Sequence, residues 1–349
     1  MQKEILAESI KEKAIQLGFE GCGIIPIDEM REYEEKLNQR IEACPASKPM
    51  LEPLRKYAKL YETYDWSKSV IVCVTSYNQY QFPDEMKGLI GKYYLYDHKL
   101  QPEAKMNKSI VDFEKYIEGF GIKIAKELHG VTSGRLAAQK AGLGLIRKNN
   151  FLYTQSGSRV IIDTWVIDYA LELKEKTQLK ACPQDCNQCM SACPTQALSS
   201  PYCTDMATCI TRLTWGVRDL PDEGLREKMK TWIYGCDACQ NACPMNKEIE
   251  QRQQEYAGLD ALTKEISLEN IFVMDEAQLK QIMAPKFWFI TPENFWLWKV
   301  NVLRAMANSY KEEYGTLIRL AAASENEKIR KMANWAAEQV GLEIGMLNE

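Results

Sequence analysis

The spacing of hydrophobic residues changes twice along the chain. Up to about residue 175, helical stretches with apolar side chains every three or four positions alternate with short β-branched runs, which is typical of an α/β or α+β unit. The clearest strand, Ser69–Thr75, is continuous in apolar and β-branched residues, and this predicts that it is buried. The expected elements are helices at 1–20, 104–128 and 130–144 and strands at 21–26, 69–75 and 160–168.

Beyond about residue 250 the helical period returns without a convincing strand. Apolar residues recur at helical spacing in 295–318 and in 324–341, and such paired short helices predict a small HEAT-like repeat cap. Because one or two repeats cannot stand alone, this cap is expected to pack on the rest of the chain. The predicted parts are an N-terminal α/β (α+β) domain at 1–175, a cysteine-rich module at 176–250 and a C-terminal helical HEAT-like cap at 251–349.

Two short runs of cysteine dominate the middle part. The first begins at Cys182 and the second at Cys236, and each ends on a Cys-Pro pair with two or three residues between successive cysteines. Such runs predict a ferredoxin-like module with two 4Fe–4S clusters, because a turn aims neighbouring thiolates at one cluster while the cysteine before proline ligates the other. The predicted ligands are Cys182, Cys186, Cys189 and Cys243 for the first cluster and Cys193, Cys209, Cys236 and Cys239 for the second.

Some alternatives stay open for these cysteines. Cys203 competes with Cys209 for the last place in the second cluster, and the gap of three residues after Cys182 is longer than the usual two. Paired cysteine runs also bind structural zinc, but zinc does not explain the two Cys-Pro endings. A disulfide framework is typical of short secreted chains, and this chain has 349 residues.

Composition and charge limit the cellular compartment and the classes of binding partner that we expect for this chain. With 44 Lys and Arg against 48 Asp and Glu, the net charge of −4 does not by itself indicate nucleic acid or an anionic membrane. No apolar run approaches the ~20 residues needed to span a bilayer. Exposed clusters and unpaired Cys22, Cys44 and Cys73 fit a reducing cytoplasm. We therefore expect a cytoplasmic monomer without a membrane partner.

Four segments complete a recognisable pattern. They are Ala141–Asn149, Gly157-Ser158, Gly235–Asn246 and Lys299–Asn308. Together with the cysteine runs they resemble the epoxyqueuosine reductases, iron–sulfur enzymes that use cobalamin on tRNA, over about residues 8–341. The resemblance implies an oxidoreductase. In it, a low-potential donor such as ferredoxin or flavodoxin would deliver electrons through both clusters to a cobalamin between the N-terminal domain and the clusters.

The resemblance also assigns roles to single residues. Gly142 and Gly144 would let the backbone approach a corrin ring, and an ordinary helix C-cap is the alternative explanation. His98 aligns with a family position, and Asp97 and Tyr96 beside it complete the predicted catalytic group. The predicted cofactor-binding residues are Ala141, Gly142, Leu143, Gly144, Lys148, Asn149, Gly157 and Ser158.

The chain departs from the family pattern at two positions. The family's catalytic aspartate lies thirteen residues before Ala141, and here that count gives Leu128, between Glu127 and His129. Because a reduced substrate needs a titratable group within hydrogen-bond reach, this departure puts epoxyqueuosine itself in doubt as the substrate. Arg147 also stands where the family has glycine.

Three functions are compatible with these observations. The first is a cobalamin-dependent reductase that acts on a small-molecule or nucleoside substrate other than epoxyqueuosine. The second is an electron-transfer or corrinoid-reducing protein, which acts on a protein partner and needs no proton donor of its own. The third is tRNA epoxyqueuosine reductase proper, which requires that the lysines and arginines within residues 286–331 form a basic face.

Overall fold

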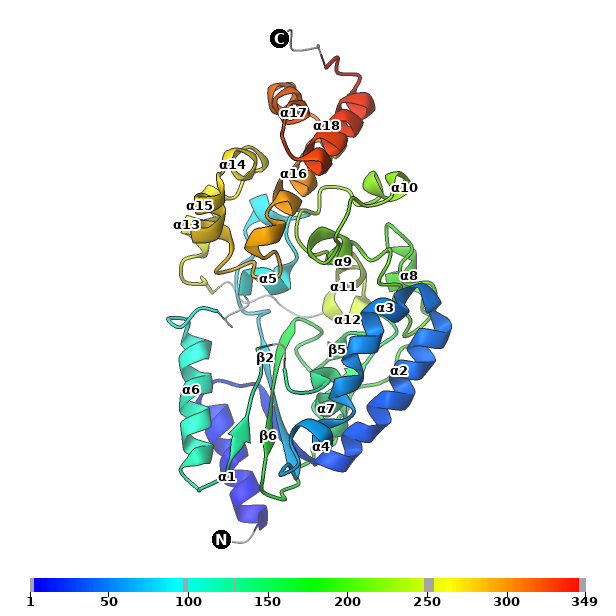
Figure 1. Ribbon diagram of the computed structural model, residues 1–349. Coiled ribbons are helices and arrows are strands. Elements are labelled where there is room, and N and C mark those ends of the chain that lie inside the picture. Colours follow the sequence, from blue (N-terminus) through cyan, green and yellow to red (C-terminus); the bar gives the residue numbers. More distant parts are fainter. Residues whose placement is uncertain (1–2, 97–99, 129, 248–253, 345–349) are drawn as a thin grey trace.

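A four-stranded antiparallel sheet forms the centre of the N-terminal part (Figure 1). The structure is a computed structural model and describes residues 3–96, 100–128, 130–247 and 254–344. The strand order is β1-β2-β6-β3, and a two-stranded sheet pairs β4 with β5. The strands are β1 Gly21–Pro26, β2 Ser69–Ser76, β3 Ile124–Ala125, β4 Leu145–Ile146, β5 Leu152–Tyr153 and β6 Val160–Ile167.

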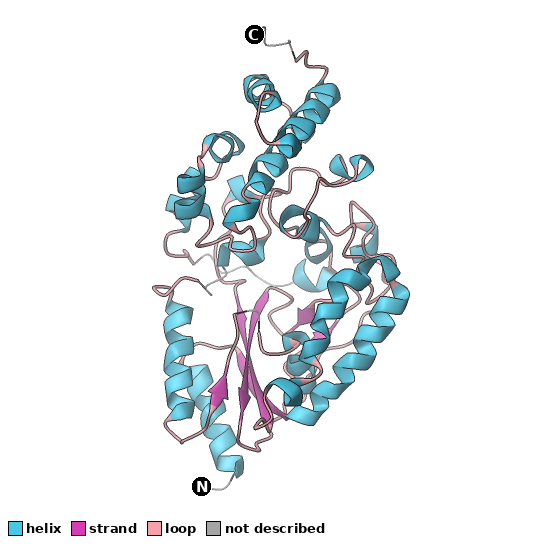
Figure 2. Ribbon diagram, in the orientation of Figure 1, coloured by secondary structure: helices cyan, strands magenta, loops and turns pink. Residues whose placement is uncertain are grey.

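Helices cover both faces of this sheet, which confirms that the strand over residues 69–75 is buried. Figure 2 shows the strands between two layers of helices. Side chains alternate along β2, so Ile71 and Cys73 pack with α1 and α6 whereas Val72 and Val74 pack with α2 and α7. The helices of this part are α1 Lys3–Gln16, α2 Glu32–Ala43, α3 Lys48–Leu51, α4 Leu60–Thr63, α5 Lys92–Tyr96, α6 Lys105–Glu118 and α7 Gly134–Lys140.

The predicted helix at 104–128 is too long. Helix α6 ends at Glu118, because Gly119 follows as its C-cap and Gly121 adopts a positive φ of 73°. The chain then enters β3, an edge strand of two residues that pairs with the end of β6 and that the sequence did not indicate. The helix expected at 130–144 is also shorter, since α7 begins at Gly134.

Each cysteine run folds into the same short unit. The last cysteine before the Cys-Pro pair of each run lies on one turn of helix, Cys189 on α8 and Cys239 on α11, and these two helices pack together. The pair lies beside the upper end of the central sheet in Figure 1. The helices of the module are α8 Gln188–Ser191, α9 Ile210–Trp215, α10 Glu223–Arg226, α11 Ala238–Asn241 and α12 Pro244–Lys247.

After residue 254, the described residues contain helices and no named strand, as expected. Helix α16 packs on α14 and α18, and its apolar side chains share a core with Tyr77, Tyr96 and Tyr234 from earlier in the chain. The cap therefore packs on the rest of the molecule, although HEAT-like repeats stay a prediction. The helices are α13 Leu259–Glu265, α14 Leu268–Val273, α15 Glu276–Gln278, α16 Trp296–Asn308, α17 Tyr314–Ala322 and α18 Glu327–Val340.

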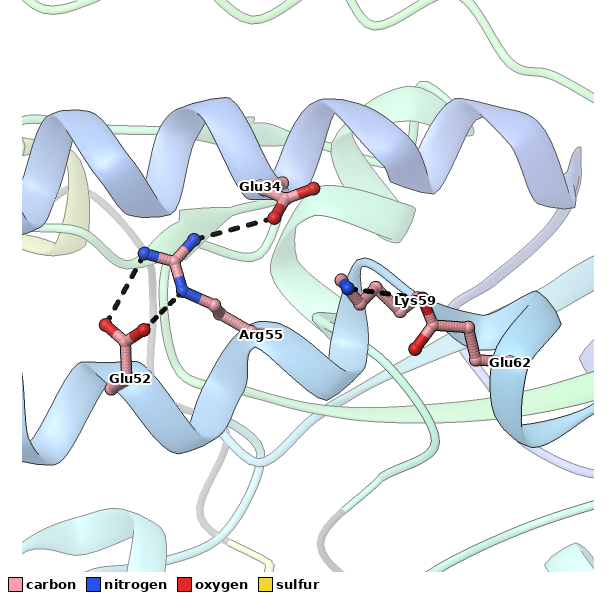
Figure 3. Close-up of polar contacts among 5 residues, drawn as sticks. All are labelled: Glu34, Glu52, Arg55, Lys59 and Glu62. Atoms are coloured by element: carbon pink, nitrogen blue, oxygen red, sulfur yellow. Dashed lines mark hydrogen bonds and ion pairs between the residues drawn. The ribbon is translucent and has the colours of Figure 1, made fainter.

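Charged side chains outside the core form surface pairs. In Figure 3, Arg55 lies between Glu52, at 2.7 Å from its Nε, and Glu34 of α2, at 3.6 Å from its Nη1. Lys59 and Glu62 form a second pair at 3.2 Å. Because water screens such pairs, each contributes little to stability. In the part of the chain that the structure describes, no helix combines the length and the apolar character that a membrane span requires.

Candidate cluster sites and the adjoining cleft

The predicted ligands of the first cluster come from three directions. Cys182 lies in a loop, Cys189 lies on α8, and Cys243 lies just before α12. Burial raises the pKa of the Cys189 thiol, and Cys243 and Cys182 raise it further because a second negative charge nearby is unfavourable. The thiols of Cys182, Cys189 and Cys243 are therefore neighbours, although Cys182 and Cys243 lie 61 positions apart in the sequence.

The loop from Cys182 to Cys186 curls around one lysine. The Lys148 ammonium donates hydrogen bonds to the backbone carbonyls of Pro183, Gln184 and Cys186 at 2.7, 2.8 and 2.8 Å. Lys148 is buried, so these carbonyls replace the water that its charge would otherwise bind. The unusual gap of three residues gives the loop enough carbonyls to surround the ammonium.

Arg147 reaches the same site. Its guanidinium is 3% exposed, and Nη1 lies 3.8 Å from the Cys182 sulfur. Nε and Nη2 are buried and have no hydrogen-bond partner among the described residues. The guanidinium also stacks over Tyr153 at 5.1 Å, and burial together with the nearby Cys243 raises the pKa of the Tyr153 hydroxyl. Free N–H donors beside thiol ligands fit an anionic iron–sulfur cluster.

The predicted ligands of the second cluster line one cavity of about 540 Å³. Burial raises the pKa of Cys209, Cys236 and Cys239, and their neighbouring thiols raise each further. Backbone N–H groups face the sulfurs, since Ala238 donates to Cys236 at 3.5 Å and the start of α9 donates to Cys209. Such donors stabilise thiolates, so this site also fits a cluster. The cysteines are Cys193, Cys209, Cys236 and Cys239.

Cys203 is bonded to Cys44 in a disulfide that spans 159 residues. The expectation that Cys44 is an unpaired thiol is therefore wrong, because the fold brings the end of α2 against the loop after the first cysteine run. Ser47 and Asp205 are hydrogen-bonded at the same junction at 3.0 Å. Because Cys203 is held in this disulfide, the structure favours Cys209 over Cys203 as the last ligand of the second cluster.

Gly142 and Gly144 were expected to approach a corrin, but neighbouring protein backbone is what requires glycine at both positions. Gly142 follows α7 with a φ of 77°, and the N–H groups of Gly142 and Leu143 close the helix end as in a Schellman motif. A Cβ atom at Gly142 would lie 1.8 Å from the carbonyl oxygen of Glu175, and one at Gly144 would lie 2.3 Å from that of Tyr153. The observed close approaches are therefore to other segments of the chain.

The remaining predicted cofactor residues join the N-terminal domain to the cysteine module. Ala141 is buried against Gly23, and the Asn149 amide donates to the Tyr153 hydroxyl at 2.9 Å. Ser158, next to Gly157 in a tight turn, donates from its backbone N–H to Asn246 at 2.9 Å and from its hydroxyl to Gln240 at 2.8 Å. None of the eight predicted residues is among the described residues lining a cleft of about 910 Å³ at the end of β2, so their corrinoid contact stays a prediction. The residues are Ala141, Gly142, Leu143, Gly144, Lys148, Asn149, Gly157 and Ser158.

That cleft has a volume of about 910 Å³ and lies at the end of β2. Four tyrosines line it, and their rings contact one another: Tyr96 stacks on Tyr77 at 5.5 Å and on Tyr80 at 5.3 Å, and Tyr256 meets Tyr80 edge-on at 4.9 Å. Polar side chains of α6, together with Gln254 and Glu255, also line the cleft. Stacked rings combined with polar groups suit a large planar ligand with polar substituents.

Of the predicted catalytic group, the structure describes Tyr96, which borders this cleft. Tyr96 is buried, donates its hydroxyl hydrogen to the Gln81 carbonyl at 2.7 Å, and has a pKa that burial raises. Its hydroxyl is therefore protonated and already engaged. Asp97 and His98 lie outside the described residues, as does His129.

The cleft is joined to the second cysteine run by charged side chains. Burial raises the pKa of Tyr77, and Asp237, which lies between two predicted ligands, raises it further. Asp237 accepts a hydrogen bond from the Lys92 backbone at 2.8 Å. Arg159, another neighbour of Tyr77, lies 3.3 Å from the Asn241 side chain on α11. The Tyr77 backbone N–H donates to the Arg159 carbonyl at 3.0 Å, so Arg159 links the cleft to α11 of the second cysteine run.

Among the described residues next to Leu128, no carboxylate lines this cleft. The Leu128 side chain is 42% exposed and borders a separate hollow of about 70 Å³. The Glu127 carboxylate accepts the Tyr64 hydroxyl at 2.7 Å and lies 3.5 Å from the Lys56 ammonium. Glu127 is therefore held at the surface and does not take the place of the aspartate.

Comparisons with known proteins agree with this geometry. Residues 181–246 match the family model described as a 4Fe–4S double cluster binding domain. The chain is 30% identical over 244 residues to an epoxyqueuosine reductase of Leadbetterella byssophila, covering 69% of this chain and 80% of the relative. The chain belongs to the epoxyqueuosine reductase family. A Gloeobacter violaceus member is 30% identical over 291 residues, covering 79% of this chain and 88% of the relative.

Solved structures of the family share the fold. A crystal structure of epoxyqueuosine reductase with a tRNA-Tyr stem loop aligns with a TM-score of 0.79 at 20% identity, over 97% of this chain and 91% of that one. The Bacillus subtilis enzyme, with its catalytic aspartate loop swung out of the active site, aligns with a TM-score of 0.77 at 21% identity and the same coverage. As a family member, the chain is an oxidoreductase with two 4Fe–4S clusters.

Sequence reasoning missed some residues of these sites. The sequence marked Arg147 as a departure from the family but gave it no role. Lys148 was assigned to a cofactor, whereas its side chain holds the first cysteine loop. Tyr153 and Cys44 carried no signal, because their partners lie 90 and 159 residues away in the sequence.

Proposed function

We propose that the chain is a cobalamin-dependent reductase of the epoxyqueuosine reductase family, acting on an activated nucleoside or small molecule other than epoxyqueuosine. Its double-cluster, ferredoxin-like module would take electrons from a low-potential donor such as ferredoxin or flavodoxin. The observation that carries the proposal is a path of hydrogen bonds from the 910 Å³ cleft to α11 of the second cysteine run. Tyr77, which lines the cleft, donates from its backbone N–H to the Arg159 carbonyl at 3.0 Å, and the Arg159 guanidinium lies 3.3 Å from the Asn241 side chain.

The residues of the cleft suit a corrinoid. The stacked rings of Tyr80 and Tyr96 offer an apolar surface to a macrocycle, and amide side chains such as Gln79 and Gln101 can bond to its amide arms. A bound corrinoid would supply low-valent cobalt as the reductant, and the protein would supply its position and surroundings. The predicted segment Ala141–Asn149 would support the cluster side of this assembly through the contacts of Lys148.

The side chains of the cleft are arranged to hold protons. The raised pKa values of Tyr77 and Tyr96 keep both hydroxyls protonated at neutral pH. Lys92 does not line the cleft but a separate small pocket that it shares with Tyr77 and Tyr96. Burial lowers its pKa to about 8, so its ammonium can give up a proton near physiological pH. Asp97 and His98 remain the predicted catalytic partners of Tyr96.

The substrate is inferred from the position of the family's aspartate. Leu128 cannot deliver a proton, and Glu127 is bound to Tyr64 at the surface. We therefore expect anaerobically purified protein to leave epoxyqueuosine in a tRNA stem loop unreduced, and Leu128→Asp to gain that activity. Rapid turnover of epoxyqueuosine by the unmodified chain would show that the substrate inference is wrong.

Corrinoid binding is the first test. Titration of the anaerobic protein with cobalamin, followed by its visible spectrum, should give saturable binding at micromolar protein. Tyr80→Ala removes one stacked ring, and such a contact contributes about 0.5–1.5 kcal/mol, so the Kd should rise roughly two- to tenfold. Tyr169→Ala at the surface is the matched control and should leave the Kd unchanged. No binding by the unmodified protein would end the proposal.

A second candidate is tRNA epoxyqueuosine reductase proper. It is favoured by the likeness of the fold, over 97% of the chain, to a family member in complex with a modified tRNA stem loop. Lys286 and Arg304 are buried, so the expected basic face is reduced to exposed side chains such as Lys311, Arg319 and Lys331. These would contact phosphates, and the affinity for tRNA should fall steeply as the salt concentration rises. Binding that does not change with salt, or no binding, would remove this candidate.

A further inference from the structure

A buried guanidinium without an anionic partner lies beside the first cysteine site. Arg147 belongs to the turn that joins β4 and β5, and its backbone closes that turn through hydrogen bonds with Phe151 at 3.0 Å and Asn150 at 2.8 Å. The side chain is 3% exposed and ends 3.8 Å from the Cys182 sulfur. Nε and Nη2 lack a hydrogen-bond partner among the described residues.

The unpaired N–H groups of the buried Arg147 guanidinium favour an anion beside them. A buried donor that makes no hydrogen bond costs about 1–3 kcal/mol, and more when it carries charge. In the described part of the chain no carboxylate pairs with Arg147, and its remaining neighbour is the ring of Tyr153. A cluster ligated by four thiolates is an anion, and its charge becomes one unit more negative when it accepts an electron.

The neighbouring lysine does not take this role. The three donors of Lys148 are directed at three backbone carbonyls, so its ammonium holds the loop. The guanidinium of Arg147, by contrast, has N–H groups left for the cluster. Tyr153, from the same hairpin, lies under the guanidinium and near Cys243, which helps to raise the pKa of its hydroxyl. The hairpin therefore places two side chains beside two different ligands of one cluster.

We infer that Arg147 is a redox-tuning residue of the first 4Fe–4S cluster: its guanidinium donates hydrogen bonds to cluster sulfur and raises that cluster's reduction potential. The direction follows from charge, because a fixed cation stabilises the reduced, more negative form more than the oxidised form. Hydrogen bonds to the sulfurs and local charge are established determinants of such potentials. The inference rests on the two-cluster assignment and is independent of the corrinoid.

The test is a redox titration of reconstituted protein, monitored by electron paramagnetic resonance with dithionite as the reductant. Arg147→Met keeps a similar stem and removes the donors. Where iron content remains at about eight per chain, one cluster should become at least tenfold harder to reduce at a fixed potential, a shift of about 59 mV to more negative values for one electron. The other cluster should be unchanged. Arg147→Lys keeps the charge without the planar fork and should shift the same cluster less.

Two controls separate this effect from others. Arg218→Met at the surface makes the same change in net charge and should shift neither cluster. Arg212 lines the cavity of the second site, so Arg212→Met must leave the Arg147-dependent cluster unchanged. Equal shifts of both clusters in Arg147→Met, or an unchanged potential with full iron content, would overturn the inference.

A measurement on the unmodified protein covers the case in which the variants do not assemble their clusters. Arginine labelled with ¹⁵N in the guanidinium should give a hyperfine coupling to a reduced cluster in electron–nuclear double resonance. That coupling should persist in Arg212→Met. Absence of any arginine coupling would overturn the inference as well. Because neither experiment contains cobalamin or substrate, a failure here is distinct from a failure of the proposed function.

Discussion

Replacing Lys148 with methionine should release the first cysteine loop and leave the second site intact. Methionine keeps an unbranched stem but removes an ammonium that bonds to three carbonyls, those of Pro183, Gln184 and Cys186. A hydrogen bond to a charged group contributes about 1.5–3 kcal/mol. Pro183 and Gln184 are exposed, so water replaces part of the loss. We expect a cost of about 2–4 kcal/mol for closing this loop, or roughly 30- to 700-fold more opening.

The assay is iron release. Anaerobically reconstituted Lys148→Met should lose iron to a chelator in two phases, a fast phase from the first cluster and a slow phase at the rate of the unmodified protein. Its iron content should fall from about eight toward about four per chain. Lys180→Met is the matched control, because Lys180 is exposed just before the same loop, and it should behave like the unmodified protein. If Lys148→Met keeps full iron and releases it at the unmodified rate, the ammonium does not hold the loop and the reasoning is refuted.

Three further outcomes are expected. Cys209→Ser should abolish the spectroscopic signal of one cluster, whereas Cys203→Ser should keep both, and the reverse result would exchange their roles. Burial lowers the pKa of Lys92 from 10.5 to about 8. Its contribution to stability should therefore rise between pH 8 and 10.5, where the unfolded chain binds more protons, and an NMR midpoint near 10.5 would contradict this. Gly142→Ala places a Cβ 1.8 Å from a backbone carbonyl at a residue with positive φ, so it should lower the free energy of unfolding by more than ~1 kcal/mol and lower the Tm. Gly224→Ala is the control, because a Cβ there meets open space and should leave the Tm unchanged. Equal Tm values for the two variants would refute the packing argument.

The elements that sequence predicted best are those whose signal is local. The strand at Ser69–Ser76 follows from a continuous β-branched run, and α16 and α18 follow from apolar residues at helical spacing. The cysteine runs are equally local, because gaps of two or three residues fix how neighbouring thiols can point. The short edge strand β3 was missed, since two residues carry no period.

Contacts between distant segments could not be predicted in this way. The pairing of Cys44 with Cys203 depends on the end of α2 meeting the loop after the first cysteine run. Tyr96 was assigned to catalysis from its place in the chain, and only the fold shows that its hydroxyl is engaged by Gln81. The antiparallel strand order is also a tertiary outcome, because hydrophobic pattern sets which residues are buried and not which strands are neighbours.

By itself, the sequence determined that this protein carries two sets of cluster-forming thiols between a mixed helix and sheet domain and a helical end. Residue spacing is sufficient for this conclusion, because gaps of two or three residues restrict how neighbouring thiols can point. Only the tertiary structure decided that Lys148 holds a cysteine loop and that Arg147 lies beside a thiol with free donors. Both results depend on burial, which removes water from a charge and obliges it to find a partner elsewhere in the fold.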